Sequence, residues 1–441
     1  MEAIPGNVFP RNLTSPLPQA DQASGVYIQD DTGKRYLDAS GGAVVVNAGH
    51  GRAEMAKAVH DQILSHAYIH PTMFTTPAVE TLAARLAEKS DNRISRFYFF
   101  SGGAEANEGA MKLARQIQLA RGEEGRYRMV GRWKSYHGLT LGALGVMGRT
   151  GFKTPFAPML KDNLHIPAPY CYRCPFQLTP DHCDLQCANA LEHTIENAGP
   201  DTVAAFMAET LPGATIAAAL PPKGYLPRIV EICDRYGVLL ILDEVMCGTG
   251  RTGSFYAFDH FDVTPDIVTL GKGLAGGVMP LSAMGTREEH FNLIRKKDGF
   301  MHGGTFSHHP VAAAAGNALL DILEEEALIA QVKHRGEKMG ELLKSHLSHI
   351  PQVGDIRGMG FLWGMELVAD RETKAPFDRA LKTTETLWQK LFDKGFILYK
   401  STGLAGAHGD ALVLAPPFTL AEDEMEALIL AVKETLEDHF N

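Results

Sequence analysis

Apolar segments that alternate with helical ones constrain the fold of this chain more than any other feature, and they begin at about residue 75. Short runs rich in β-branched and aromatic residues predict strands, and stretches with apolar residues at helical spacing predict helices. Strands that are apolar throughout are typical of a mostly parallel sheet covered by helices on both faces, so we expect an α/β fold. The predicted strands span 96–100, 129–130, 203–208, 238–242, 267–270 and 281–284, and the predicted helices span 78–88, 104–120 and 226–235.

The two ends of the chain lack this alternation. Near the start, two strand-like pieces, 25–28 and 35–38, flank a Thr32-Gly33 turn, which predicts a hairpin. Beyond about residue 310 the pattern is helical through 319–347 and then mixes strands at 357–367, 396–399 and 411–415 with a terminal amphipathic helix. We interpret both ends as one smaller α+β domain, with 1–65 and 316–441 in it and 66–315 in the large domain.

The bulk composition excludes several classes of partner. The net charge is -10 without basic blocks, which gives no electrostatic reason to bind nucleic acid or an anionic membrane. No apolar run approaches the roughly 20 residues that span a bilayer. Residues 1–5 lack a basic-then-apolar signal pattern, and six cysteines in 441 residues do not suggest a disulfide scaffold. We expect a cytoplasmic protein.

Lys272 is the first candidate for chemistry, because it lies between Gly271 and Gly273 directly after the predicted strand 267–270. The flanking glycines clear space, so a flat molecule could approach the amine. Asp243, at the end of another strand, could hold a cation on the far side of that molecule. A lysine bound through an imine, with an acid on a pyridinium nitrogen, is how proteins hold pyridoxal 5'-phosphate (PLP). The alternatives are an exposed loop lysine and a helix-capping aspartate.

Two further motifs follow predicted strands, where ligands of open α/β sheets bind. In the run 101–107, Gly102 and Gly103 open a helix, so backbone N–H groups and the helix dipole could hold a phosphate. The alternative is a simple glycine-rich turn. Tyr136, next to His137, could stack on an aromatic cofactor, although such a pair is often only a surface or core detail.

The segment 248–253 matches the dinucleotide pattern G-x-G-x-x-G. That pattern binds a dinucleotide only where it joins a strand directly to a helix. Here it leads into Ser254-Phe255-Tyr256, which does not resemble a helix start. The sequence therefore disfavours a nicotinamide or flavin dehydrogenase.

Four cysteines in a proline-rich segment have the spacing of zinc ligands: Cys171, Cys174, Cys183 and Cys187. A bound metal would help to order a segment with so little periodicity. The alternative, which we favour, is that these thiols are merely buried or pair on oxidation. The prediction is therefore no metal, with these four residues as the candidates for zinc.

The motifs together resemble the class III, or omega, aminotransferases, which are PLP enzymes of fold type I. The resemblance covers nearly the whole chain, and the segment 169–176 is similar to that of a bacterial subgroup. Its most specific part is the block 239–253 followed by the Lys272 run. The other matching blocks are 36–42, 47–51 and 412–418.

The resemblance implies a role for each matching residue. Lys272 would bind PLP covalently, and Asp243 would pair with its pyridine nitrogen. Val245 and Tyr136 would lie on the two sides of the ring, with His137 beside Tyr136. The remaining implied residues are Gly102, Gly103 and Ala104 at the phosphate, Glu209 near the substrate, Arg251 as a structural part of its loop, and Thr305 at the phosphate of a neighbouring subunit. The last role implies a homodimer with shared sites.

Two departures from the family pattern stand out. Thr210 follows Glu209 where the family usually has proline. Many members also carry an arginine before the Pro416-Pro417 strand to hold a substrate carboxylate, but 401–410 has none. Lys400 and His408 are the basic residues of that region, and neither offers a planar two-pronged grip on a carboxylate.

The expected function is transfer of an amino group from an amine or omega-amino acid to an oxo acid such as pyruvate. Lys272, freed by the donor, would move a proton between the donor carbon and the cofactor. The alternatives are a PLP-dependent decarboxylase, epimerase or lyase on the same scaffold. A different class is a zinc-stabilised binding protein without chemistry.

Overall fold

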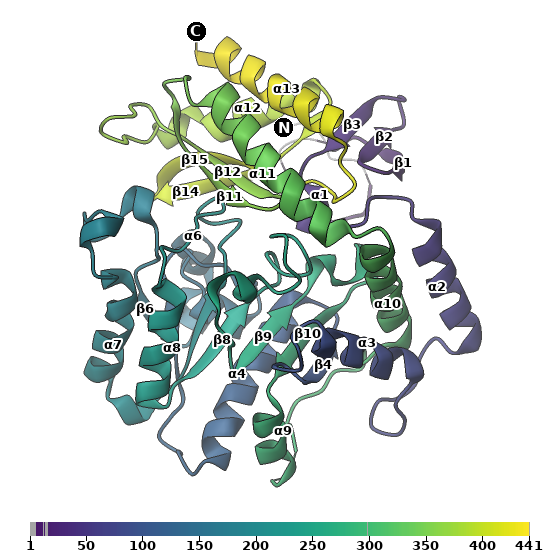
Figure 1. Ribbon diagram of the computed structural model, residues 1–441, viewed down its shortest axis with the longest axis vertical. Helices are drawn as coiled ribbons and strands as arrows, with labels where there is room; N and C mark the ends of the chain where they lie inside the picture. The colour runs from purple at the N-terminus through teal and green to yellow at the C-terminus, as the bar shows by residue number, and fades with distance from the viewer. Residues whose placement is uncertain (1–5, 12, 14–15, 298, 441) are drawn as a thin grey trace.

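A seven-stranded sheet forms the centre of the computed structural model, which describes residues 6–11, 13, 16–297 and 299–440 (Figure 1). The strand order is β4-β10-β9-β8-β7-β5-β6, and the pairings are parallel except for the two made by β10. The prediction of a mostly parallel sheet is confirmed. The strands are β4 Arg96–Phe100, β5 Arg128–Arg132, β6 Leu164–Ile166, β7 Val203–Glu209, β8 Leu239–Asp243, β9 Ile267–Leu270 and β10 Ser282–Thr286. The three-residue β6 was not predicted, since so short a run carries no period.

Helices cover both faces of this sheet because successive side chains of each strand point to opposite faces. In β8, Leu239 and Ile241 pack into the core cluster of α4, whereas Leu240 and Leu242 pack with α7 and α8. Among the described residues, every helix is too short or too polar to span a bilayer. The helices up to this point of the chain are α1 Gly41–Val44, α2 Ala53–Ser65, α3 Pro77–Glu88, α4 Gly103–Ala120, α5 Leu141–Val146, α6 Thr150–Lys153, α7 Gln186–Ala198, α8 Tyr225–Tyr236, α9 Glu288–Arg295 and α10 Pro310–Glu325.

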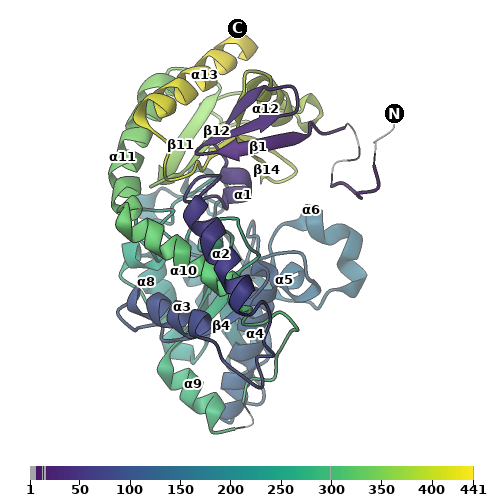
Figure 2. The same cartoon turned by 90° about the vertical axis from the view of Figure 1, so that its right-hand side faces the viewer.

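Both ends of the chain build the other end of the molecule (Figure 2). One four-stranded sheet has the order β1-β2-β3-β13, in which β13 from the C-terminal part pairs in parallel with β3. The other, β11-β12-β15-β14, is antiparallel. These elements are β1 Ala20–Ser24, β2 Tyr27–Asp30, β3 Arg35–Asp38, α11 Leu328–Leu347, β11 Val353–Met359, β12 Leu362–Leu367, α12 Thr383–Asp393, β13 Phe396–Ile397, β14 Tyr399–Ala405, β15 His408–Leu414 and α13 Glu422–Phe440.

The domain boundaries at residues 65 and 315 remain a prediction. Residues 1–5, on which the expectation of no targeting signal rests, lie outside the described residues. The predicted hairpin of β2 and β3 is confirmed, with Gly33 at a φ of 86° in its turn.

Two predicted elements of the C-terminal part are each divided in the structure. The helical stretch 319–347 is two helices, α10 and α11, because Ala327 adopts a left-handed φ of 48° between them. The strand 357–367 is a hairpin of β11 and β12 that turns at Gly360, whose φ is 55°. The glycine is required there by space as well, since a Cβ on it would lie 2.5 Å from the carbonyl carbon of Thr252.

The packing of α11 on this hairpin generates a stability prediction. A Cβ on Gly336 would lie 2.5 Å from Cα of Gly360, so Gly336→Ala forces the helix and the turn apart. Overpacking costs about 1–3 kcal/mol, which exceeds the gain of up to ~1 kcal/mol from alanine's helix propensity. We expect a lower midpoint in thermal unfolding. Gly151→Ala in α6, where a Cβ would meet nothing within 4 Å, is the control and should not lower it. Equal midpoints for both variants would contradict this packing.

Candidate functional site

The carboxyl ends of three parallel strands bring the predicted residues together. Glu209 ends β7 and Asp243 ends β8, and the two pair directly in register. Asp243 also pairs with Thr269 of β9, and Lys272 follows β9 after Leu270 and Gly271. This edge faces the smaller sheets at the other end of the molecule (Figure 1).

Asp243 is a buried carboxylate held by three donors from three segments. Its Oδ2 lies 2.8 Å from Nδ2 of Asn107 and 2.8 Å from Nδ1 of His137, and its Oδ1 accepts the Val245 N–H at 2.9 Å. Burial raises the pKa of this carboxyl and is the largest single influence. The hydrogen bonds from His137, Val245 and Asn107 together outweigh it and lower the pKa below its usual value. Asp243 is therefore anionic, and Oδ1 keeps a lone pair for a further donor.

Lys272 has a constrained backbone at the same edge. Its φ is 45°, a left-handed value that costs free energy for a residue with a side chain. A Cβ on Gly273 would lie 2.2 Å from Nδ2 of Asn47, so glycine is required after the lysine. A Cβ on Gly271 would lie 3.2 Å from Cγ1 of Val245. The two glycines therefore make room for side chains of the chain itself, Asn47 and Val245, and the predicted approach of a flat molecule stays a prediction.

The amine of Lys272 is poorly hydrated, although the residue is partly accessible. Burial lowers its pKa, and the nearby Asp243, Cys247 and Glu209 act in the opposite direction, Asp243 the most of the three. A lowered pKa increases the fraction of neutral amine, which is the nucleophilic form. The side chain therefore lies within electrostatic reach of Asp243 and carries a reactive amine.

Val245 packs against both glycine-rich segments. A Cβ on Gly103 would lie 2.8 Å from its Cγ1, and a Cβ on Gly271 would lie 3.2 Å from the same atom and 3.6 Å from Cα of Gly103. Val245 therefore packs where the start of α4 meets the turn that carries Lys272.

The start of α4 has the donors that a phosphate requires. The N–H groups of Ser101 and Gly102 donate to Oε2 of Glu105, at 3.0 and 3.2 Å. Gly103 and Ala104 are the first helical residues, and their N–H groups have no acceptor within the helix. The available donors are therefore those of Gly103 and Ala104, whereas the N–H of Gly102 is already bonded. Together with the free lone pair of Asp243 and the Lys272 amine, these groups fit PLP.

Tyr136 is held at the site through its backbone. Its N–H donates to Oε1 of Glu209 at 3.0 Å, and Nη2 of the buried Arg132 donates to the Glu209 carbonyl at 2.6 Å. Burial raises the pKa of Glu209, while the charges of His137 and Arg132 act against that rise. Glu209 therefore fixes the loop that carries Tyr136.

Sequence reasoning missed two residues of this network. Asn107 donates to both Asp243 and the His137 carbonyl, and its own Oδ1 accepts from Thr269 at 2.7 Å. Asn107 lies in the predicted phosphate-binding run, one helical turn after Gly103, so its spacing was the available signal. Arg132 gave no signal, because an arginine at a strand end is usually exposed.

The Thr210 departure also has a structural reason. Its hydroxyl donates to Oε1 of the buried Glu244 at 2.8 Å. Glu244 accepts the N–H groups of Ala257 and Phe258 as well, both at 2.7 Å. Thr210 thus satisfies a buried acid that a proline could not reach.

Thr305 lines a cavity beside the start of α4. It is exposed, and the cavity, of about 350 Å³, is also lined by Ser101, Glu105, Glu108, Phe100 and the segment 302–307. Its chain neighbour Phe306 is 59% exposed and lies 6.3 Å from the ring of Tyr68. The role of Thr305 at the phosphate of a neighbouring subunit stays a prediction.

The four zinc candidates line one small cavity, together with Tyr170 and Pro222. All are free thiols, and burial raises the pKa of Cys187 to about 12. Within the described chain, the one group with three possible ligand atoms within 4.8 Å of one another is Asp266, Glu289 and His290. The thiols are therefore near one another but not at the spacing of metal ligands.

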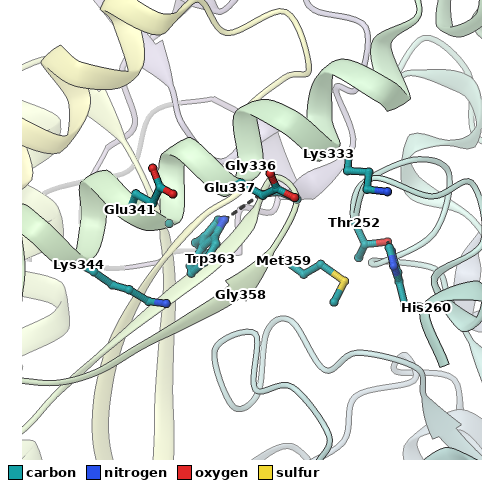
Figure 3. A pocket seen from close by; sticks show the side chains of 12 residues that line it. Thr252, His260, Lys333, Gly336, Glu337, Glu341, Lys344, Gly358, Met359 and Trp363 are labelled. Carbon is teal, nitrogen blue, oxygen red and sulfur yellow. Dashed lines mark hydrogen bonds between the residues drawn. The ribbon is translucent and has the colours of Figure 1, made fainter. Parts of the chain in front are cut away.

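A larger cavity, of about 410 Å³, lies between α11 and the β11–β12 hairpin (Figure 3). Its α11 wall carries charges of both signs, from Lys333, Glu337, Glu341 and Lys344 along successive turns of the helix. Trp363 is fixed there by donating to the Gly360 carbonyl at 2.8 Å. None of the predicted site residues lines it.

The segment 248–253, part of which borders this cavity, forms turns and no helix start, as predicted. Arg251 within it is buried and bonds to Asn47, Phe361 and Pro416.

Comparison with known proteins connects this site to a family. The sequence profile described as aminotransferase class-III matches residues 8–436. The chain is 31% identical to the putrescine–pyruvate aminotransferase of Pseudomonas aeruginosa, over 94% of this chain and 90% of that protein. The match confirms the predicted resemblance.

Two solved structures share the whole architecture. An (S)-enantioselective omega-transaminase from Thermomicrobium roseum is 36% identical, with a TM-score of 0.92 over 98% of this chain and 97% of that one. An amine transaminase from an uncultivated Pseudomonas species, solved in its PLP-bound form, is 33% identical, with a TM-score of 0.92 over 99% of each chain. The predicted fold type I architecture is confirmed. This chain therefore belongs to the class III aminotransferases, which are PLP-dependent enzymes.

Proposed function

We propose that Lys272 bonds covalently to PLP and that Asp243 pairs with the ring nitrogen of the cofactor. The observation that carries this proposal is the dehydrated amine of Lys272 within electrostatic reach of a buried, anionic Asp243. The other proposed roles are Val245 and Tyr136 on the two sides of the ring, His137 and Glu209 behind Asp243 and Tyr136, and the N–H groups of Gly103 and Ala104 at the phosphate, with Gly102 directly before them.

The chain's own groups move and hold protons around the cofactor. PLP, when bound, accepts the electrons of a substrate carbanion. Asp243 keeps a proton on the ring nitrogen, which that electron uptake requires. Lys272, once displaced by the donor, acts first as a general base and takes a proton from the donor carbon. It then acts as a general acid and gives that proton to the cofactor. The lowered pKa of Lys272 favours the neutral amine that this step needs.

The proposed donor is a primary amine or omega-amino acid, and the proposed acceptor is an oxo acid such as pyruvate. The relative that acts on putrescine and pyruvate, and the omega-transaminase neighbours, support this class. The comparisons give no support to the alternatives of a decarboxylase, epimerase or lyase. Purified protein incubated with putrescine and pyruvate should form alanine in step with the carbonyl product, whereas release of ammonia or carbon dioxide without alanine would contradict transamination.

The same proposal includes a homodimer with shared sites. Large apolar side chains are exposed around the Thr305 loop and the end of α2, which is unusual for a monomer's surface. They include Leu64 at 74%, Met73 at 73%, Phe74 at 68% and Met301 at 75%. A second copy would bury this surface and bring its own Thr305 to the first copy's cofactor. We also propose a cytoplasmic location, supported by six cysteines that are all free thiols.

Replacing Lys272 with Ala should abolish turnover and remove the cofactor that borohydride fixes to the chain. The reason is that both the covalent bond to PLP and the proton transfer need the Lys272 amine. The measurements are transamination of putrescine with pyruvate and mass spectrometry of the reduced protein. Lys333→Ala, at the exposed wall of the Figure 3 cavity, is the matched control and should keep both properties. Full transamination by the Lys272 variant would refute the assignment.

Replacing Asn107 with Ala removes one of three donors to Asp243, so the pKa of that carboxyl should rise. A group with a depressed folded pKa stays ionised above that value and loses its charge as pH falls through it. The pH below which PLP binding is lost should therefore be higher in this variant. PLP affinity near neutral pH should fall about 10-fold, which is the effect of losing one charge-assisted hydrogen bond. The measurement is cofactor absorbance titrated across pH. Asn292→Ala, which removes an exposed bond to Glu288, should leave the profile unchanged. An unchanged profile for Asn107→Ala would contradict the role of this donor.

Replacing Thr305 with Val should weaken PLP binding about 10-fold, through loss of a hydroxyl bond to phosphate. Thr154→Val, an exposed hydroxyl bonded to the Thr150 carbonyl, is the control. Heterodimers of a Lys272→Ala chain with a Thr305→Val chain test the sharing of sites. If Thr305 acts across the interface, both defects fall in one site and the other site is intact. Tight PLP binding at half the sites is then expected, and its absence would place Thr305 in its own chain's site.

A further inference from the structure

Arg149, the residue before α6, has a guanidinium held beside the proposed cofactor face. Its Nη2 donates to the Thr402 carbonyl at 3.0 Å, with Oγ1 of Thr402 at 3.5 Å. Its Cζ lies 4.9 Å from the centre of the Phe152 ring, and the Tyr136 ring lies 6.1 Å from that same ring. Phe152 thus neighbours both the guanidinium and the residue proposed to cover the cofactor.

This guanidinium has no anionic partner. Among the described residues, the Arg149 side chain forms its hydrogen bonds with Thr402 and with no acidic side chain, although the arginine is half-buried. Its recorded bonds use Nη2 alone, and Nε and Nη1 are not among the buried atoms without a partner, so both stay accessible. A half-buried cation without an anion is costly, which makes the position favourable for an anionic ligand.

The electrostatics connect Arg149 to the site as well. Burial lowers the pKa of Arg149, and Tyr399 and Tyr136 act in the opposite direction. In turn, burial raises the pKa of Tyr136, and Arg11 and Arg149 lower it. Arg149, Tyr136 and Tyr399 therefore form one group of side chains, with Arg149 on the side of Tyr136 that faces the segment 399–405.

The other basic residues of that region are engaged elsewhere. Nζ of Lys400 lies 3.9 Å from the centre of the Trp388 ring. The exposed His408 accepts the Arg379 N–H on Nδ1 at 3.3 Å. Arg11 is exposed on the N-terminal segment. Lys134, which is also half-buried, donates its Nζ to the Leu404 carbonyl. Among the described residues, Arg149 is thus the half-buried arginine with free donors beside Tyr136.

We infer that Arg149 binds the substrate carboxylate and so determines specificity for carboxylate-bearing substrates. The inference rests on the proposed function, since it names the ligand class of that same site. Arginine suits this task, because a guanidinium donates several hydrogen bonds to a carboxylate in a fixed geometry. It also accounts for an oxo-acid acceptor in a chain whose segment 401–410 has no arginine.

The test compares two amines that differ in one group. Alanine carries a carboxylate where isopropylamine carries a methyl group. The first half-reaction, followed by the loss of the bound cofactor's visible absorbance, should fall about 100-fold with alanine in Arg149→Gln and stay within about threefold with isopropylamine. Arg149→Lys, which keeps the charge, should fall between wild type and Arg149→Gln. Propionate, a carboxylate that cannot react, should bind about 100-fold more weakly to Arg149→Gln by calorimetry.

The control is Lys153→Gln, which removes a cation from α6, the helix directly after Arg149. It should change neither the relative rates with alanine and isopropylamine nor the affinity for propionate, because Nζ of Lys153 donates to the Gly145 carbonyl. An equal loss with both amines would mean that Arg149 is only structural, and loss of selectivity in Arg11→Gln instead would assign the carboxylate to Arg11. Either result, or an unchanged propionate affinity, overturns the inference. If the wild type forms no alanine from pyruvate, the proposed function fails, while the propionate comparison still tests Arg149.

Discussion

A negative charge buried at the end of β8 is the constraint on which the site depends. Removing a carboxylate from water costs several kcal/mol unless donors replace the water. For Asp243 those donors come from α4, from the loop after β5 and from the turn after β8. All three segments must therefore be in place before the free-energy cost of burying this charge is offset. That requirement fixes the geometry around Asp243 at the same time as it keeps the carboxylate ionised.

A second group of buried charges also supports the site. Arg132 at the end of β5 holds Glu209 at the end of β7, and Glu209 holds the Tyr136 backbone. Their contribution is to hold the loop after β5 that carries Tyr136 and His137. Preorganisation of this kind lets the polar groups of a site act without rearrangement.

Sequence reasoning predicted the residues whose position has a local cause. Lys272 and Asp243 follow apolar strands, and Gly103 opens a helix, so period and strand ends were enough to find them. Asn107, Arg132 and Arg149 were not found, because each acts through a partner far away in the chain: Asp243, Glu209 and Thr402. The break at Ala327 was missed for a related reason, since an alanine favours helix locally and adopts its left-handed φ only under tertiary packing.

The parallel pairing of β3 with β13 joins residues from opposite ends of the chain. The N-terminal hairpin can form early, yet the inner edge of β3 finds its partner only after Phe396 has left the ribosome. Until then this edge offers unpaired N–H and C=O groups to any other extended strand. Contacts so distant in sequence also form slowly. The nascent chain therefore carries an open sheet edge through most of its synthesis, until β13 emerges and closes it.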